Sequence, residues 1–209
     1  MSSKNLWDSI SSSYDKKFGP EYERIIKRIT RELRPEDEVL EVACGTGLVC
    51  FPAAERCRSI LGIDFSERMI EVAREKQVKA KVDNVEFATG DAMELSRFRS
   101  RFDAVILCNM LHVVHNPARA LEEAAHSLKP GGRVLIATYC HGERLKPRAA
   151  AFSLGMRFLH RLGRIPAMHR LSYAQTIKLV TGAGLRVIKA QLITGEGFPC
   201  AFIVAQVRD

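Results

Sequence analysis

The stretch Glu41-Val42-Ala43-Cys44-Gly45-Thr46-Gly47 decides the fold, because it joins an apolar strand to a helix through a glycine-rich loop. Gly45 and Gly47 are the residues that let a backbone bend sharply and approach a ligand closely. Many doubly wound α/β folds carry such a loop at this place, so the loop alone does not identify the ligand. The residues around the loop are needed to identify the ligand.

Short apolar runs alternate with helical segments on both sides of this loop. Bounded by turn residues, the runs are predicted to be strands over residues 38–42, 59–63, 85–88, 102–107 and 133–138. Helices are predicted from the loop to about residue 56, from Ser66 to about residue 77, and over residues 117–128. This alternation predicts an α/β fold with a parallel sheet and right-handed crossovers.

The two ends of the chain depart from this alternation. Residues 5–33 are predicted to form two helices, broken at Phe18-Gly19-Pro20. Residues 141–170 are basic and largely helical. A helix and a hairpin then close the chain, over residues 172–183, 185–193 and 201–207. The last strand should therefore run antiparallel to the rest of the sheet.

Length and composition exclude several classes of protein. The 209 residues suffice for one α/β domain and are too few for two. No run of about 18 apolar residues predicts a membrane span, and the first residues lack a signal-peptide pattern. Six cysteines stand singly, which argues against a zinc site or a disulfide framework. We therefore expect a reduced, cytoplasmic protein with no metal.

Polar residues stand at the ends of four successive strands. Glu41 lies in the first, and Asp64 ends the second 23 residues later. Asp91 follows the third strand, and Asn109 follows the fourth. Open α/β sheets bind ligands at the carboxyl ends of their strands, so these side chains predict a binding site at that edge.

With these residues in place, the chain resembles the class I S-adenosylmethionine-dependent methyltransferases, close to the group that methylates ubiquinone and menaquinone precursors. The resemblance rests on residues 39–47, Leu61-Gly62-Ile63-Asp64-Phe65-Ser66, Gly90-Asp91-Ala92, Phe102-Asp103-Ala104-Val105 and Leu128-Lys129-Pro130-Gly131-Gly132. It implies a doubly wound, mostly parallel seven-stranded sheet in the order 3-2-1-4-5-7-6, with an antiparallel last strand and helices on both faces.

The resemblance also implies how the single domain is divided. Residues 1–36 would be an N-terminal helical cap and residues 37–140 the cofactor-binding core. Residues 141–170 would be a basic helical lid insertion, and residues 171–209 the closing helix and hairpin.

The implied cofactor is S-adenosylmethionine (SAM). Its methionine part would be held by Glu41 and the loop, that is by Ala43, Cys44, Gly45 and Gly47. Asp64 would bind the ribose hydroxyls, with Phe65 and Met69 packed near the adenine.

The remaining cofactor contacts would come from the third and fourth strands and from the N-terminal cap. Asp91 would accept a hydrogen bond from the adenine amino group, beside the backbone of Ala92. Asn109 and Leu111 would line the methionine side through backbone groups, and Tyr14 would close over the cofactor.

One position departs from the family pattern. The family commonly has glycine where this chain has Ala43. A methyl group fits there without strain only if the backbone keeps a negative φ, so this residue bears on cofactor affinity and not on the fold. We expect the neighbouring Cys44 to be a small filler of the loop rather than a reactive thiol.

Methyl transfer from a sulfonium needs alignment and a dry pocket, and it needs a base only when the acceptor must lose a proton. His112 is the first candidate for such a base, because imidazole titrates near neutral pH and this ring follows the fourth strand. His115 is the second. The expected acceptor is a small molecule or a lipid-like compound.

The net charge of +8 is concentrated near one end. Residues 141–209 hold 11 of the 32 Lys and Arg residues and only 3 of the 24 Asp and Glu residues. The basic segment 144–170 is interpreted either as a cover helix with solvated arginines or as a lid. A lid there would admit an apolar or anionic acceptor, with contact to a membrane surface as one option.

A module that binds the cofactor without catalysis is disfavoured, because Glu41, Asp64 and Asp91 are all present. Two other functions remain as alternatives. An NAD-dependent oxidoreductase would have a third glycine where Cys50 stands, so it is disfavoured. A DNA acceptor is not expected, because Asn109-Met110-Leu111-His112 lacks the motif of amino-methylating DNA enzymes. An RNA acceptor stays open, given the basic segment.

Overall fold

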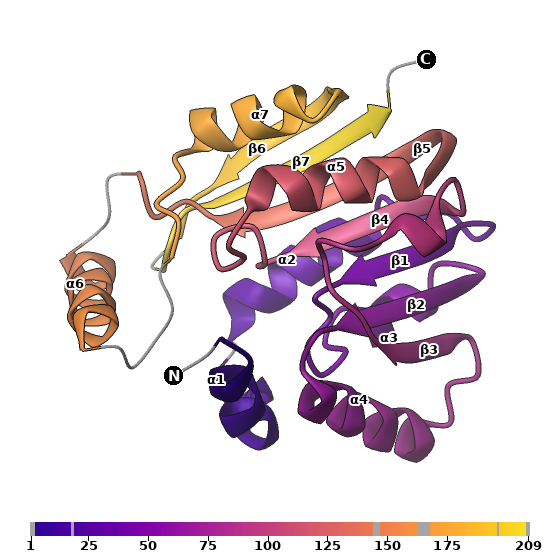
Figure 1. The fold of residues 1–209 in the computed structure, drawn as a ribbon, viewed down its shortest axis with the longest axis horizontal. Helices are drawn as coiled ribbons and strands as arrows, with labels where there is room; N and C mark the ends of the chain where they lie inside the picture. The colour runs from indigo at the N-terminus through magenta and orange to yellow at the C-terminus, as the bar shows by residue number, and fades with distance from the viewer. Residues whose placement is uncertain (1–2, 18, 144–146, 163–167, 196, 208–209) are drawn as a thin grey trace.

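A computed structural model describes residues 3–17, 19–143, 147–162, 168–195 and 197–207 (Figure 1). Its centre is a seven-stranded sheet in the order β3-β2-β1-β4-β5-β7-β6. Strands β1 to β5 pair in parallel, and β7 pairs antiparallel with both β5 and β6. The predicted fold class, strand order and reversed last strand are confirmed.

The strands follow the apolar runs closely. Their bounds are β1 Glu38–Val42, β2 Ser59–Asp64, β3 Val85–Thr89, β4 Phe102–Cys108, β5 Leu128–Tyr139, β6 Leu185–Ile193 and β7 Cys200–Val207. Strand β4 lies near the middle of the sheet, and nearly all of its residues are buried. That burial explains why its sequence is apolar without alternation.

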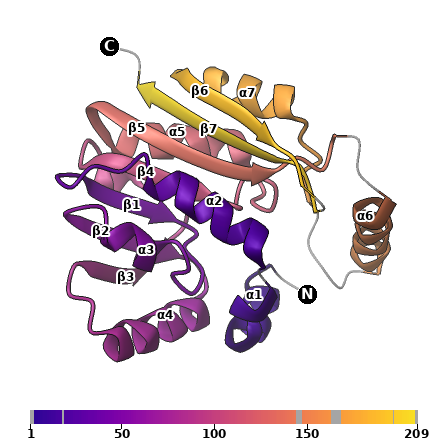
Figure 2. The same ribbon diagram turned by 180° about the vertical axis from the view of Figure 1, so that it is seen from behind.

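Helices cover both faces of the sheet (Figures 1 and 2). Their bounds are α1 Ser3–Ile10, α2 Pro20–Thr30, α3 Cys50–Ala54, α4 Glu67–Ala80, α5 Pro117–Ser127, α6 Pro147–Arg161 and α7 Tyr173–Gly182. Buried residues of α2, α3 and α4 form one core with one face of the sheet, and α5 and α7 form a second core with the other.

Local signals in the sequence set where the helices begin. Ser66 caps α4 by accepting a hydrogen bond from Met69 N, and Asn116 caps α5 with Pro117 as its first residue. Ser172 and Gln175 form a reciprocal capping box at the start of α7.

Several elements differ from their predicted bounds. The first helix ends at Ile10 and 3₁₀ turns follow it to Lys17, and α4 continues to Ala80. Helix α3 is a short helix over Cys50–Ala54, flanked by turns on both sides, where the sequence predicted a helix reaching from the loop to about residue 56. Strand β5 begins at Leu128, five residues before its predicted start, because Leu128 pairs with Phe102. The residues between Leu128 and Arg133 form an irregularity in that pairing, where the sequence predicted a turn.

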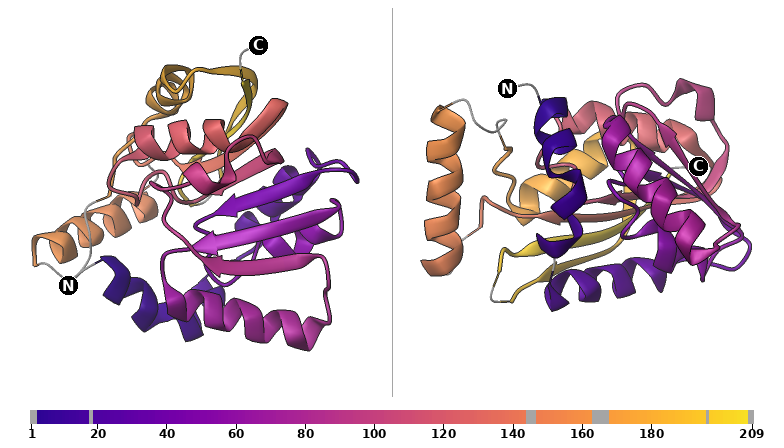
Figure 3. Two further views of the ribbon diagram at one scale, coloured as in Figure 1. Left: turned by 45° about the vertical axis from the view of Figure 1, so that its right-hand side comes forward. Right: turned by 90° about the horizontal axis from the view of Figure 1, so that it is seen from below.

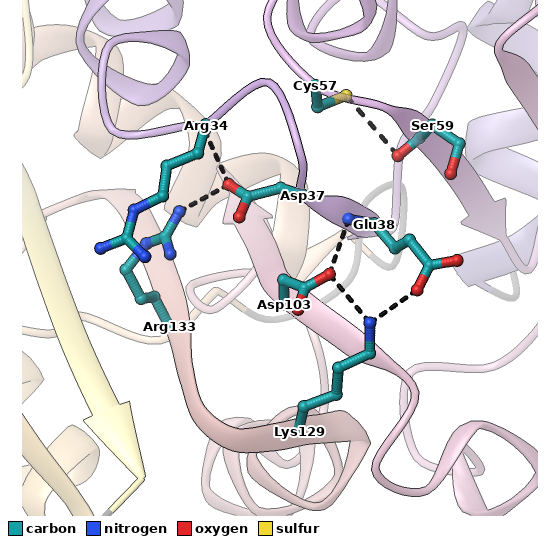
Figure 4. Close-up of polar contacts among 8 residues, drawn as sticks. All are labelled: Arg34, Asp37, Glu38, Cys57, Ser59, Asp103, Lys129 and Arg133. Atoms are coloured by element: carbon teal, nitrogen blue, oxygen red, sulfur yellow. Dashed lines mark hydrogen bonds and ion pairs between the residues drawn. The ribbon is translucent and has the colours of Figure 1, made fainter.

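Ion pairs join the strands at the edge opposite the predicted site (Figure 4). Asp37 accepts hydrogen bonds from Arg133 at 2.6 Å and from the backbone of Arg34 at 2.8 Å. Lys129 Nζ lies 2.6 Å from Glu38 and 3.0 Å from Asp103. These contacts hold together the amino ends of β1, β4 and β5. They lie at the edge of the sheet opposite the carboxyl ends, where the sequence predicts the binding site.

In the described ranges, no helix is both long enough and apolar enough to cross a membrane.

Candidate functional site

A cavity of about 430 Å³ opens at the carboxyl edge of the sheet. Its walls come from the ends of β1 to β4, from the N-terminal segment and from the segment after α6. The lining residues are Trp7, Tyr14, Ala43, Gly45, Asp64, Phe65, Met69, Gly90, Asp91, Ala92, Met93, Cys108, Asn109, Met110, Val113, Val114, His115 and His169. Nine of the fourteen site residues predicted from the sequence are among them.

Asp64 ties two loops together at the cavity wall. One carboxylate oxygen accepts from the backbone N–H of Gly45 and the other from that of Ser66, each at 2.9 Å. Burial raises the pKa of Asp64, and these two N–H donors act in the opposite direction. A carboxylate has about four acceptor positions, so two stay available for a ligand.

The glycine loop follows β1 with a left-handed backbone. Gly45 has a φ of +55°, and Tyr14 Cε1 lies 3.3 Å from the point where a Cβ on Gly45 would stand. Ala43 has a φ of +57°, so the condition for fitting a methyl group without strain is not met. The chain therefore holds an alanine where the backbone favours glycine.

Gly47 and Cys44 serve the packing of the loop, and neither lines the cavity. A Cβ on Gly47 would stand 2.8 Å from Phe87 Cζ and 3.0 Å from Phe51 Cε2. Cys44 is buried, and its Sγ lies 3.6 Å from Gly45 O. Gly47 is thus required by the aromatic rings beneath the loop.

Glu41 points into the protein and is not among the lining residues. Its side chain is 2% exposed, and its Oε2 accepts a hydrogen bond from Cys50 Sγ at 2.8 Å. Burial raises the pKa of this carboxyl to about 8, against the effect of the Cys50 thiol. The sequence predicted a contact with the cofactor, whereas the structure places Glu41 behind the loop.

The residues predicted to lie near adenine share one wall-lining region of the structure. Phe65, Met69, Asp91 and Ala92 all line the cavity. Asp91 Oδ1 accepts from the backbone of Met93 at 2.8 Å, which fixes the turn after β3.

Asn109 ends β4 in a left-handed conformation with a φ of +53°, which asparagine tolerates better than most residues. Its amide group is buried beside Tyr139, and neither Nδ2 nor Oδ1 makes a well-formed hydrogen bond to the described residues. A buried polar group without a well-formed hydrogen bond is costly, so this amide has capacity for a partner from a ligand or from water. Leu111, by contrast, is fully buried in the core beneath α5.

The N-terminal segment is held over the cavity by polar contacts. Asp8 accepts from Ser66 Oγ at 2.5 Å. Asp15 accepts from Thr46 Oγ1 and from Lys76 Nζ, the latter at 2.9 Å. These contacts place the Tyr14 ring over the loop, with Trp7 edge-on to it at a centroid distance of 6.1 Å. Trp7 and Tyr14 both line the cavity.

His112 lies behind the cavity wall, so its position differs from the one predicted for a base. The ring is buried, and its Nδ1 lies 3.1 Å from Thr138 Oγ1. Burial lowers the pKa of His112 to about 3, helped by His141 and His169. Such a ring stays neutral and supports the wall.

Two other histidines do line the cavity, His115 and His169. His169 donates from its backbone N–H to His112 O at 2.8 Å, and its Nε2 lies 2.8 Å from Val114 O. His115 was the second candidate in the sequence. His169 stands 54 positions after it, and only the return of the chain from α6 brings the two to one cavity.

Among the described residues, no group of three or more histidine, cysteine or acidic side chains is placed to hold a metal ion.

The chain is similar to known proteins over this same region. A family model described as a methyltransferase domain matches residues 33–179. A demethylmenaquinone methyltransferase from Staphylococcus aureus is 39% identical over 114 residues, which are 52% of this chain and 46% of that protein. The enzyme of the same name from Renibacterium salmoninarum is 34% identical over 107 residues, 51% of this chain and 43% of that one. The match thus spans less than half the length of these curated relatives.

Solved structures share the whole fold at low sequence identity. A SAM-dependent methyltransferase from Thermotoga maritima superposes with a TM-score of 0.74 at 20% identity, covering 99% of this chain and 100% of that one. Another from Aquifex aeolicus has a TM-score of 0.71 at 20% identity, covering 95% and 98%. Since the family model covers well over half of its length, the chain belongs to the methyltransferase domain family, and its fold is the class I fold of SAM-dependent methyltransferases.

Proposed function

We propose that the protein transfers a methyl group from SAM to a small, apolar or lipid-like acceptor. The observation that carries this proposal is the mixed lining of one cavity. Asp64, Asp91 and the buried Asn109 amide supply polar groups from three strand ends. Met110 and the valines at positions 113 and 114 supply an apolar wall. Its volume of about 430 Å³ lies within the usual range for small-molecule sites.

The residues present fit SAM. Asp64 keeps acceptor capacity for ribose hydroxyls after binding Gly45 and Ser66. Gly45 and Tyr14 line the cavity side by side, and Met69 and Phe65 offer apolar surface to an adenine. Glu41 would act from behind the loop, as a buried carboxyl that fixes Cys50 and the loop with it.

When bound, SAM supplies an activated methyl group whose bond to sulfur breaks as the acceptor atom forms its own bond to carbon, and the electron pair stays on sulfur. The task of the chain is to align the acceptor, to exclude water and to receive a proton where the acceptor has one to lose. The half-buried Trp7–Tyr14 cover and the apolar wall perform the first two tasks.

His169 is the residue we assign to the proton. The carbonyl of Val114 can only accept, so His169 Nε2 must carry the hydrogen of that 2.8 Å contact. In the neutral tautomer that this contact selects, the lone pair is on Nδ1, so Nδ1 is the atom that would take the proton. The role that the sequence gave to His112 thus passes to a ring that lines the cavity.

A lipid-like acceptor agrees with the relatives, which carry the name demethylmenaquinone methyltransferase. The apolar residues Met110, Val113 and Val114 suit an aromatic or isoprenoid acceptor better than a polar one. All six cysteines are free and buried, which fits a reducing compartment such as the cytoplasm.

The first experiment measures cofactor binding. Trp7 is the only tryptophan and lines the cavity, so its fluorescence should respond when SAM is titrated into the protein. NAD serves as the negative control. A response to NAD and none to SAM would overturn the proposal.

The second experiment measures transfer of the labelled methyl group to a panel of acceptors: reduced naphthoquinones, phenols, amines, phospholipids and RNA. We expect transfer to the quinols or phenols, and loss of that transfer in Asp64→Asn. Transfer to RNA alone would replace the proposed acceptor by the RNA alternative.

A further inference from the structure

Helix α6 carries an apolar face that the rest of the described chain leaves exposed. Leu154 is 65% exposed, Phe158 62% and Leu162 53%. They stand at intervals of four residues, and the hydrogen bond from Leu162 N to Phe158 O continues the helix, so the three lie on one face. Large exposed apolar side chains in a row are typical of an interaction surface.

Arginines flank this face. Arg157 and Arg161 each lie three residues after an apolar member, and both are exposed. Neither forms an ion pair with any residue that the structure describes. Over residues 144–195 the sequence has 10 Lys and Arg residues and no Asp or Glu. We name Leu154, Arg157, Phe158, Arg161 and Leu162 together the α6 face.

The base of the α6 excursion is closed. Gly142 N donates to Leu171 O at 3.0 Å, and a Cβ on Gly142 would stand 2.7 Å from Arg170 O. His169, at this base, lines the cavity. Figure 3 shows α6 set apart from the sheet, on the side of the strands' carboxyl ends. The excursion that carries the α6 face therefore leaves the fold at the rim of the cavity.

We propose that the α6 face docks the protein on a lipid bilayer that contains anionic lipids. Apolar side chains flanked by arginines match a bilayer surface, where acyl chains lie beneath negative headgroups. The absence of acidic residues from 144 to 195 favours an anionic surface, and a second copy of the same basic face would be repelled. Docking there would turn the cavity rim toward the membrane. The proposal stands apart from the proposed methyl transfer, because binding needs no turnover.

The test measures co-sedimentation of the full chain with vesicles. One set contains phosphatidylcholine alone, and the other contains phosphatidylcholine with about a third phosphatidylglycerol. We expect binding to the anionic vesicles that weakens with added salt, and much weaker binding to the neutral ones. The measurement is repeated without SAM, so that failure of methyl transfer leaves its result intact.

Two variants locate the contact. Leu154→Ser with Phe158→Ser removes the apolar part, and Arg157→Gln with Arg161→Gln removes the charge. Each pair should lower the partition coefficient about tenfold or more. Val78→Ser with Lys79→Gln is the matched control, because Val78 is 77% exposed on α4, and it should bind as the unchanged chain does.

A second readout covers the case in which a variant folds poorly. Phe158→Trp, in a chain with Trp7→Phe, should show a blue shift of its fluorescence on anionic vesicles. Equal binding by the α6 variants and the unchanged chain would overturn the proposal. The proposal would also be overturned if the unchanged chain formed a dimer that Phe158→Ser dissociates, because the α6 face would then bind a second copy. It would be overturned as well if the chain bound RNA through this face and anionic vesicles did not compete for that binding.

Discussion

The carboxylate of Asp64, at the end of β2, accepts a hydrogen bond from the backbone N–H of Gly45, 2.9 Å away in the loop after β1. One side chain thus fixes the loop and faces the cavity at the same time. Its second oxygen holds Ser66, which begins the cap of α4. The ends of β1 and β2, which the sequence predicts one by one, are therefore joined by the hydrogen bonds of a single carboxylate.

Asp64→Asn should weaken SAM binding at least tenfold, because a charged acceptor is replaced by an amide that has to turn one donor toward an N–H group. Titration followed by Trp7 fluorescence measures the change. Asp103→Asn is the control, since it removes a contact to Lys129 at the opposite edge. Equal SAM affinity in the unchanged chain and Asp64→Asn would contradict the role given to this residue.

Ala43→Gly should stabilise the protein by about 0.5–1 kcal/mol. A left-handed alanine costs about 1–2 kcal/mol, and the extra freedom of glycine in the unfolded chain takes back about half of the gain. Gly45→Ala should do the reverse, because it adds the same strain at a φ of +55° and a methyl group 3.3 Å from Tyr14. Urea denaturation measures both changes.

Gly182→Ala is the matched control for this pair, because a Cβ there meets nothing within 4 Å. It should not lower stability. If Ala43→Gly were destabilising, the left-handed backbone at that position would be wrong.

The fold could be predicted because its signals are local. Strand β4 is apolar throughout, Ser66 and Asn116 cap their helices, and the glycines of the loop mark the turn after β1. The start of β5 was missed because Lys129-Pro130-Gly131-Gly132 has the composition of a turn, and pairing of Leu128 with Phe102 outweighs that preference.

The candidate site was predictable in part, for a physical reason. Residues that end strands, such as Asp64 and Asn109, reach the cavity because parallel strands share one edge. His169 could not be predicted in this way. It follows helix α6, and the sequence does not indicate that the chain returns from this helix to the cavity. Glu41 and His112 have side chains that could bind a ligand or take a proton. Both side chains are packed into the interior instead of facing the cavity, and the sequence does not show this orientation.

His169→Gln should lower kcat about 100-fold with an acceptor that loses a proton, and leave SAM affinity unchanged. Glutamine can still donate to Val114 O, so the wall is kept while the basic nitrogen is lost. His112→Gln should change kcat much less, because its ring lies behind the wall. Steady-state kinetics compare the two variants. A larger loss of kcat in His112→Gln than in His169→Gln would indicate that His112, and not His169, takes the proton.

Asp37→Ala should destabilise the protein by about 3 kcal/mol, because it leaves Arg133 buried without its carboxylate. Adding Arg133→Met should recover at least half of this loss, since a buried charge is then replaced by apolar volume. Urea denaturation of the single and double variants measures both steps. Arg68→Gln, which removes an exposed pair with Glu71, is the control and should leave the midpoint unchanged. A double variant no more stable than Asp37→Ala would argue against a buried charge as the cause.

Glu41→Gln should become more stable than the unchanged chain as the pH rises. Burial raises the pKa of Glu41 from 4.5 to about 8, so between these values the folded chain holds a proton that the unfolded chain has released. The free energy of unfolding of the unchanged chain therefore falls as the pH rises through this window, by roughly 3–5 kcal/mol from this carboxyl. Glutamine has no proton to lose, and its oxygen can still accept from Cys50.

Urea denaturation between pH 5 and about 9 measures the difference, with the exposed Glu55→Gln as the control that should follow the unchanged chain. Parallel curves for Glu41→Gln and the unchanged chain would show that Glu41 is ionised in the folded protein.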